Sequence, residues 1–264
     1  MARRTIRLTL AYEGSAYAGW QRQADSPTVQ GAIEAALERL TGQAVSLIGA
    51  GRTDAGVHAL GQVAAFTTLA KLSGQEFERA LGAMLPKDIE IIEAREAAAG
   101  FHPRYQAVSK TYRYHLWTRP RPPLFARRCL WAVGRQLDAG RMAEGLKVIE
   151  GSHDFAAFMS AGSEVSDTRR KIMRAELETK GRLWTFIFEA DGFLRHMVRA
   201  LVGTLIGGSD PEQLARIMAS GQRSQAGQTA PAQGLFLVHV RYPGQEKPLS
   251  APGPFDPLED KERA

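Results

Sequence analysis

The sequence contains a single cysteine among 264 residues, so an intramolecular disulfide framework is excluded. A chain without disulfides suits a reducing compartment, and Cys129 is expected to be a small buried hydrophobic residue. Long hydrophobic runs are also missing, because the longest apolar stretch near a helix, residues 200–208, is too short to span a bilayer. The basic start of the chain runs straight into an alternating pattern, without the apolar centre of a signal peptide. We therefore expect a soluble, cytoplasmic protein with no membrane partner.

Two kinds of ligand site lack the residues that they need. His58 has no second histidine or cysteine at metal-ligand spacing nearby, so the sequence predicts no metal site. Gly49 and Gly51 begin the spacing of a dinucleotide-binding fingerprint, but Asp54 stands where the third glycine would be and no long helical pattern follows. The sequence therefore indicates neither a metal site nor a dinucleotide site, and no cofactor is expected.

The charge of the chain gives only a weak indication of its partners. Lysine and arginine number 34 against 28 acidic residues, a formal net charge of +6. An excess of this size would attract a polyanion, but it is also found in ordinary basic enzymes. The segment 243–264 is rich in proline and acidic on balance, which predicts a disordered or surface-bound tail and leaves the positive charge on the folded part.

Hydrophobic periodicity predicts an α+β protein of two related halves. The first half, residues 1–104, has the order β-α-β-β-α-β of a ferredoxin-like unit. Its expected elements are a strand at 5–12, a helix at 28–40, strands at 44–48 and 62–66, a helix at 77–85 and a strand at 89–92. The same order recurs in the second half, residues 105–242. Its expected elements are a strand at 109–117, a helix at 139–150, a hairpin of 171–178 with 183–189, a helix at 193–206 and a strand at 235–240.

The segment GAGRTDAGVHALGQVAAF at residues 49–66 presents one carboxylate, Asp54, in a glycine-rich loop between two expected strands. Arg52 and His58 flank this carboxylate and are candidate substrate-binding residues. A carboxylate beside a guanidinium stays ionised and is oriented by bidentate hydrogen bonds, which suits a nucleophile or a base. The same residues could instead form an ordinary surface turn, in which an aspartate bonds to nearby backbone.

Two further candidates lie in the second half. Tyr112 and Tyr114 share one face of the strand at 109–117, where alternating aromatic residues usually pack in a core. Arg199 could belong to a solvated helical face. However, Gly203 follows it by four residues, so the two lie on one stripe of the helix, where another backbone can come near.

Two basic clusters are candidate RNA contacts, one from Arg119 to Arg128 and one at residues 169–171. Prolines in the first cluster are expected to hold its arginines extended, which suits the tracking of phosphates, although either cluster could be a solvated loop. The residues selected as RNA contacts are Arg22, Arg119, Arg121, Arg127 and Arg128.

Six segments together resemble the TruA family of tRNA pseudouridine synthases. They are YEGSAYAGWQRQ at 12–23, GRTDAGVHA at 51–59, FHPRYQA at 101–107, KTYRYHL at 110–116, FLRHMVRALVGTL at 193–205 and TAPAQGLFL at 229–237. The matches occur in the order of that family, and they extend from about residue 5 to about residue 242. The segment FHPRYQA departs from the family pattern at Pro103 and Gln106, where alanine and serine are usual.

This resemblance implies a function and a set of roles. The fold would be two ferredoxin-like halves with a cleft between them, acting as a homodimer on tRNA at positions 38–40 of the anticodon arm. Asp54 would be the catalytic nucleophile, Tyr112 would lie against the target base, and Arg199 would pair with the aspartate. Whether the carboxylate adds to C1′, adds to C6 or removes the 2′ proton is left open.

The sequence-based hypothesis is therefore an isomerase that converts uridine to pseudouridine in tRNA. One alternative is a non-catalytic RNA-binding protein built from paired ferredoxin-like units, although the RNP1 pattern of an RRM is not found. Another alternative is a hydrolase that acts on RNA with Asp54 as a general base.

Overall fold

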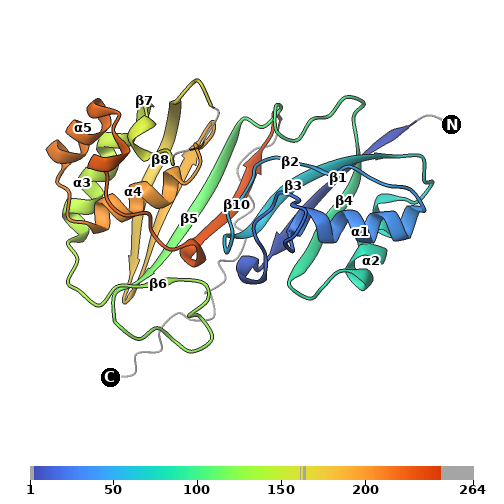
Figure 1. Ribbon diagram of the computed structural model, residues 1–264, viewed down its shortest axis with the longest axis horizontal. Coiled ribbons are helices and arrows are strands. Elements are labelled where there is room, and N and C mark those ends of the chain that lie inside the picture. Colours follow the sequence, from blue (N-terminus) through green and yellow to red (C-terminus); the bar gives the residue numbers. More distant parts are fainter. Residues whose placement is uncertain (1–2, 161, 163–164, 245–264) are drawn as a thin grey trace. The chain divides into compact units, whose positions relative to one another are not determined.

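The computed structural model describes residues 3–160, 162 and 165–244 (Figure 1), so the predicted tail lies outside the described residues from position 245 onward. The protein is α+β and divides into two compact units. The first unit comprises the described residues up to Val108 together with those from Phe236 onward, and the second comprises Ser109–Leu235.

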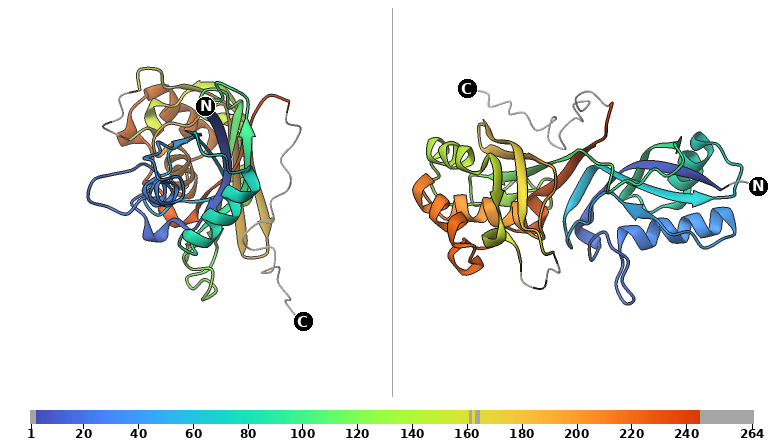
Figure 2. Two further views of the ribbon diagram at one scale, coloured as in Figure 1. Left: turned by 90° about the vertical axis from the view of Figure 1, so that its right-hand side faces the viewer. Right: turned by 90° about the horizontal axis from the view of Figure 1, so that it is seen from above.

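The first unit has the predicted ferredoxin-like order. Its elements are β1 (Arg4–Tyr12), the short 3-10 helix η1 (Gly14–Ala16), α1 (Val29–Thr41), β2 (Ile48–Gly49), β3 (His58–Thr68), α2 (Gly74–Met84) and β4 (Ile89–Ala97). Strand β1 pairs antiparallel with both β3 and β4, and β2 pairs with the outer side of β3. Helices α1 and α2 pack against each other (Figure 2).

Local capping residues set the helix boundaries of this unit, and α2 begins three residues before its predicted start at residue 77. The side chain of Thr28 accepts a hydrogen bond from the backbone N–H of Gly31 and caps α1. Gly42 ends that helix in the left-handed conformation, at a φ of 69°. At α2, Ser73 and Glu76 form a capping box.

The strand predicted at 44–48 is wrong in length and burial. Of the five residues predicted, only Ile48 pairs with β3, and Ile48 is 45% exposed. The reason lies in α1, whose side chains take the backbone groups that a strand would pair. The amide N–H of Leu47 donates to the Glu34 carboxylate at 2.9 Å, and the carbonyl of Leu47 accepts from the Gln30 amide at 2.9 Å.

The second unit is built on an antiparallel sheet in the order β5-β9-β8-β7, with β6 parallel to β5. Its strands are β5 (Ser109–Trp117), β6 (Trp131–Ala132), β7 (Gly151–Asp154), β8 (Arg169–Lys180) and β9 (Leu183–Ala190). Its α-helices are α3 (Ala139–Ile149), α4 (Met197–Ile206) and α5 (Pro211–Ser220). Short 3-10 helices occur at η2 (Ala156–Phe158), η3 (Arg223–Gln225) and η4 (Ala232–Gly234). Strand β5 and the hairpin of β8 with β9 confirm the predicted elements.

Two predictions for this unit need correction. The helix expected from residue 193 begins at Met197, because His196 has a φ of 63° and this left-handed residue cannot continue a right-handed helix. Helix α5 was not predicted, although Asp210 caps it, Pro211 stands in its first turn and Gly221 ends it.

The last strand also falls outside its predicted half. Strand β10 (Leu235–Arg241) pairs in parallel with β3 through Phe236 opposite His58 and Leu237 opposite Ala59. From Phe236 onward it therefore belongs to the first unit, whereas the sequence placed it in a half spanning 105–242. Among the described residues, no helix combines the length and the apolar character needed to cross a membrane.

Candidate active site

Asp54 lies in the loop between β2 and β3, and backbone hydrogen bonds hold that loop at several points. The N–H of Ala50 donates to the carbonyl of Val63 at 2.7 Å, at the start of the loop. The side-chain amide of the buried Gln62 donates to the carbonyl of Gly51 at 2.8 Å. A turn closed by the N–H of Val57 and the carbonyl of Asp54, at 3.1 Å, follows the carboxylate. Asp54 itself is half-buried in this fixed loop.

The residue before the carboxylate is fixed from β1. Thr53 is buried, and its hydroxyl lies 2.8 Å from the hydroxyl of Tyr12, which is also buried. Burial raises the pKa of Tyr12, so its phenol stays neutral, and either hydroxyl can donate in the hydrogen bond with Thr53. This buried pair holds the main chain at the position next to Asp54.

The segment YEGSAYAGW packs directly on the Asp54 loop. The N–H of Trp20 donates to the carbonyl of Thr53 at 3.0 Å. Gly19 has a φ of +100°, and a Cβ added there would lie 2.6 Å from the same carbonyl oxygen, so no larger residue fits. Two of the motifs found in the sequence therefore form one structural unit around Asp54.

His58 lies at the start of β3 rather than in the loop, and only 1% of it is exposed. Its Nδ1 atom accepts a hydrogen bond from the N–H of Gly14 at 3.1 Å, so in this arrangement the proton of a neutral ring is on Nε2. The ring also stacks on Phe236, with 4.6 Å between ring centroids. His58 thus connects η1 and β10 to β3. The other predicted neighbour of Asp54, Arg52, is exposed in the loop.

The two tyrosines of β5 have different surroundings within the second unit. Tyr112 is 7% exposed and meets Phe193 edge-to-face, with 5.0 Å between ring centroids. Tyr114 is fully buried, and its hydroxyl donates to the carbonyl of Pro231 at 2.8 Å. Burial raises the pKa of Tyr114, which fits a phenol used as a structural donor.

Arg199 lies in the first turn of α4 and makes a reciprocal contact with Ala230. Its Nε donates to the carbonyl of Ala230 at 2.8 Å, and the N–H of Ala230 donates to the carbonyl of Arg199 at 3.0 Å. One helical turn further on, a Cβ added to Gly203 would lie 1.7 Å from the carbonyl oxygen of Gln228. The prediction that another backbone approaches this stripe of the helix is confirmed.

The structure places the predicted residues in both units. Asp54, Arg52 and His58 belong to the first unit, whereas Tyr112 and Arg199 belong to the second. Sequence reasoning did not assign roles to the residues that hold these side chains, chiefly Tyr12, Gln62 and Ala230. All three lie within the segments quoted in the sequence analysis, and this location was the signal that could have identified them.

The basic segment from Arg119 to Arg128 is turned, which corrects the prediction that its prolines extend it. The N–H of Ala126 donates to the carbonyl of Pro123 at 3.0 Å, and the N–H of Cys129 donates to the carbonyl of Ala126 at 2.9 Å. Ala126 and Leu130 are buried against Trp117, Leu183 and the half-buried Cys129. The four arginines of the segment, at positions 119, 121, 127 and 128, are exposed around this small anchor.

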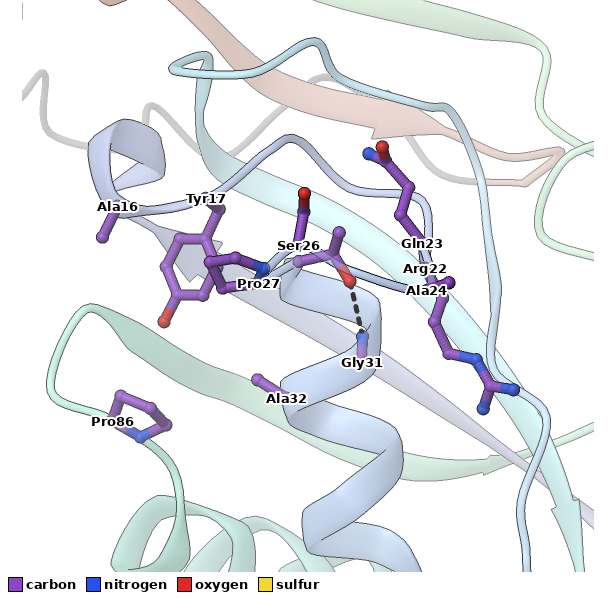
Figure 3. Close-up of a pocket in the computed structure, with 11 residues that line it drawn as sticks. Ala16, Tyr17, Arg22, Gln23, Ala24, Ser26, Pro27, Gly31, Ala32 and Pro86 are labelled. Carbon is purple, nitrogen blue, oxygen red and sulfur yellow. Dashed lines mark hydrogen bonds between the residues drawn. The ribbon is translucent and has the colours of Figure 1, made fainter.

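Arg22 stands at a separate cavity of about 710 Å³ beside the N-terminal end of α1. Figure 3 shows Tyr17 and Pro86 on one side of the helix and the Arg22 side chain on the other. The backbone N–H of Arg22 donates to Gln30 at 2.9 Å, and its guanidinium lies 3.4 Å from Glu34. The side chain nevertheless remains 70% exposed. In the part of the chain that is described, no group of three or more His, Cys, Asp and Glu side chains could hold a metal ion.

Comparison with known proteins shows which family this chain is similar to. A family model described as tRNA pseudouridine synthase matches residues 9–106 and 146–243. A tRNA pseudouridine synthase A from Moorella thermoacetica is 46% identical over 243 residues, covering 90% of this chain and 99% of the relative. The protein of the same name from Acetivibrio thermocellus is 44% identical and covers 90% and 100%. One from Solidesulfovibrio magneticus is 46% identical and covers 90% of each chain.

Proposed function

The chain belongs to the tRNA pseudouridine synthase family, and we propose that Asp54 is the nucleophile with which it converts uridine to pseudouridine. The protein is an enzyme that isomerises uridine in tRNA, so the isomerase is selected among the three functions that the sequence left open. The observation that carries the role of Asp54 is its setting. It is a half-buried carboxylate in a loop whose backbone is held by β1, by β3 and by the segment YEGSAYAGW.

The reaction needs a fixed carboxylate more than any added reagent. The bond between N1 and C1′ of the nucleotide breaks, the uracil turns, and a bond forms between C5 and C1′. The proton lost from C5 is balanced by the proton gained at N1, so substrate and product have the same atoms and the same oxidation state. Each of the three routes named above starts from an ionised carboxylate held in place.

The other site residues take supporting roles in this proposal. Arg199 keeps the carboxylate of Asp54 ionised and oriented in the working enzyme, as the family resemblance implies. Tyr112 lies against the target base, which must first leave its stack. Arg52, exposed in the loop, contacts the RNA. The buried His58 acts on substrate binding through the loop that it supports.

We propose that exposed arginines bind the tRNA and that the target nucleotides are positions 38–40 of the anticodon arm. Arg22 and the four arginines of the 119–128 segment present exposed guanidinium groups, which suit RNA phosphates. We also propose a homodimer, in which the basic surfaces of two copies form one longer track. Light scattering at micromolar concentration tests the dimer, and a monomer with full activity would contradict it.

The role of Asp54 is tested by Asp54→Asn, which is nearly isosteric. Loss of a nucleophile is expected to lower the single-turnover rate of pseudouridine formation in unmodified tRNA by at least about a hundredfold. The matched control is Asp138→Asn, because asparagine caps α3 as well as aspartate does and activity should be unchanged. An Asp54→Asn variant that retains more than about a hundredth of the wild-type rate would exclude Asp54 as the nucleophile.

A further inference from the structure

The segment between α5 and β10 lies on α4 at the turn that carries Arg199. The N–H of Gly227 donates to the hydroxyl of Thr204 at 2.8 Å, and that hydroxyl donates to the carbonyl of Ala200 at 2.7 Å. A Cβ added to Gly227 would lie 2.7 Å from the Cα of Thr204. The two main chains therefore come into direct contact at Gly203 and Gly227, and the Thr204 hydroxyl adds a hydrogen bond between them.

The guanidinium of Arg223 holds this segment in its shape. One terminal nitrogen, Nη1, donates to the carbonyls of Ala226 at 3.3 Å and Gly227 at 2.9 Å. The other, Nη2, donates to the hydroxyl of Thr229 at 2.8 Å. The side chain thus ties the beginning of the segment to the residue just before Ala230.

Ala230 is the residue that holds Arg199. It is fully buried, and its carbonyl and N–H both bond to Arg199, one to the side chain and one to the main chain. A guanidinium is rigid and planar, so a bond at Nε restricts the orientations that its two terminal nitrogens can take. A shift of Ala230 would therefore change the direction in which Arg199 presents those nitrogens.

We propose that Arg223 is a positioning residue for the isomerisation, which acts by fixing the 226–230 segment so that Ala230 orients Arg199. The proposal rests on the role of Arg199 given under the proposed function. Arginine is required at position 223 because three acceptors in different directions must be reached at once. The single ammonium group of lysine cannot match the two-nitrogen fork.

The test compares Arg223→Gln and Arg223→Lys with the matched control Arg216→Gln. Arg216 lies on the neighbouring α5, is 68% exposed and pairs only at 3.7 Å with Glu212, so the control removes the same charge without removing the contacts to the 226–230 segment. The measurements are the single-turnover rate at saturating enzyme, the Kd for tRNA, the urea midpoint of unfolding and the pH dependence of the rate.

Arg223→Gln is expected to lower the rate roughly 10- to 100-fold, Arg223→Lys to restore little of it, and the Kd to change less than about threefold, as for a group that acts on the chemical step. The acid limb of the rate profile should move in the same direction as in Arg199→Ala. Arg223→Gln acts through Arg199 in this proposal. The double variant of Arg223→Gln with Arg199→Ala should therefore react no more slowly than Arg199→Ala alone. Arg216→Gln should match the wild type.

A second variant keeps the test decisive if Arg223→Gln folds poorly. Thr229→Val is nearly isosteric and removes only the acceptor of Nη2, so a smaller loss of about 3- to 10-fold is expected. Wild-type rates in folded Arg223→Gln and Thr229→Val, or losses that simply multiply with that of Arg199→Ala, would overturn the proposal. Full activity of Arg199→Ala would instead overturn the role of Arg199, and with it the proposed function of that residue.

Discussion

Gly203→Ala is the sharpest test of how α4 is held beside the 226–230 segment. In an isolated helix this change is favourable by about 1 kcal/mol, because alanine is the better helix former. Here the new Cβ would lie 1.7 Å from the carbonyl oxygen of Gln228 and 3.2 Å from the backbone nitrogen of Ala230. Both neighbours are backbone atoms, so no side chain can rotate away and the segment or the helix must move.

The magnitude follows from three effects. Ordinary contact with a carbonyl oxygen begins near 3.4 Å, so the backbones must separate by well over an ångström. Overpacking of this kind costs about 1–3 kcal/mol. Separation also weakens the two hydrogen bonds between Arg199 and Ala230, at about 1 kcal/mol each. After the gain in helix propensity, the free energy of unfolding should fall by about 2–4 kcal/mol.

The matched control is Gly82→Ala in α2, where an added Cβ meets no atom within 4 Å and the position is exposed. This change should raise the free energy of unfolding by up to about 1 kcal/mol and leave activity unchanged. The assay is urea unfolding of both variants, followed by single-turnover pseudouridine formation under conditions where each is folded. Gly203→Ala should lose at least about tenfold in rate, because Arg199 is displaced. A Gly203→Ala protein as stable and as active as Gly82→Ala would refute the reasoning.

Three further predictions concern the proposed chemistry and RNA binding. Tyr112→Phe should lower the rate more than tRNA affinity if the hydroxyl moves a proton, whereas equal rates for Tyr112→Phe and wild type would leave only a stacking role. Its control, Tyr114→Phe, should cost about 1 kcal/mol of stability through the lost bond to Pro231 and little activity. Arg199→Ala should move the acid limb of the rate profile to higher pH, because loss of a neighbouring positive charge favours the protonated carboxyl; an unmoved limb would argue against the pairing. Replacing all four arginines of the 119–128 segment by glutamine should make the plot of log affinity against log salt shallower, by up to about 3 in slope. An unchanged slope would place the RNA on another face.

Local signals predicted most of the elements, because their causes are local. A helix that is capped by Thr28 and ended by Gly42 can be found from its own residues, since each end is decided within one turn. The same kinds of signal bound α5, with Asp210 as its cap and Gly221 at its end, so this helix too has purely local causes.

Two differences from the predicted fold have non-local causes. The apolar run at 44–48 has the composition of a strand, yet Gln30 and Glu34 of α1 bond to its backbone at Leu47 in place of a partner strand. Strand β10 follows the second half in the sequence, but its register partners are His58 and Ala59, almost 180 residues earlier. Hydrophobic periodicity describes a segment by itself and carries no information on which distant segment it joins.

The candidate residues were found from motifs, whereas the residues that hold them required the fold. Glycine connects the two levels. Gly14 and Gly203 do not have the positive φ that usually explains a glycine, yet an added Cβ would lie 2.0 Å from the carbonyl oxygen of Val57 at the first and 1.7 Å from that of Gln228 at the second. Each therefore marks a place where two main chains cross, beside the Asp54 loop in one unit and beside Arg199 in the other. A motif glycine is evidence of a backbone contact even where its conformation is ordinary, and the crossing segment is where residues such as Arg223 can position a catalytic site without touching the substrate.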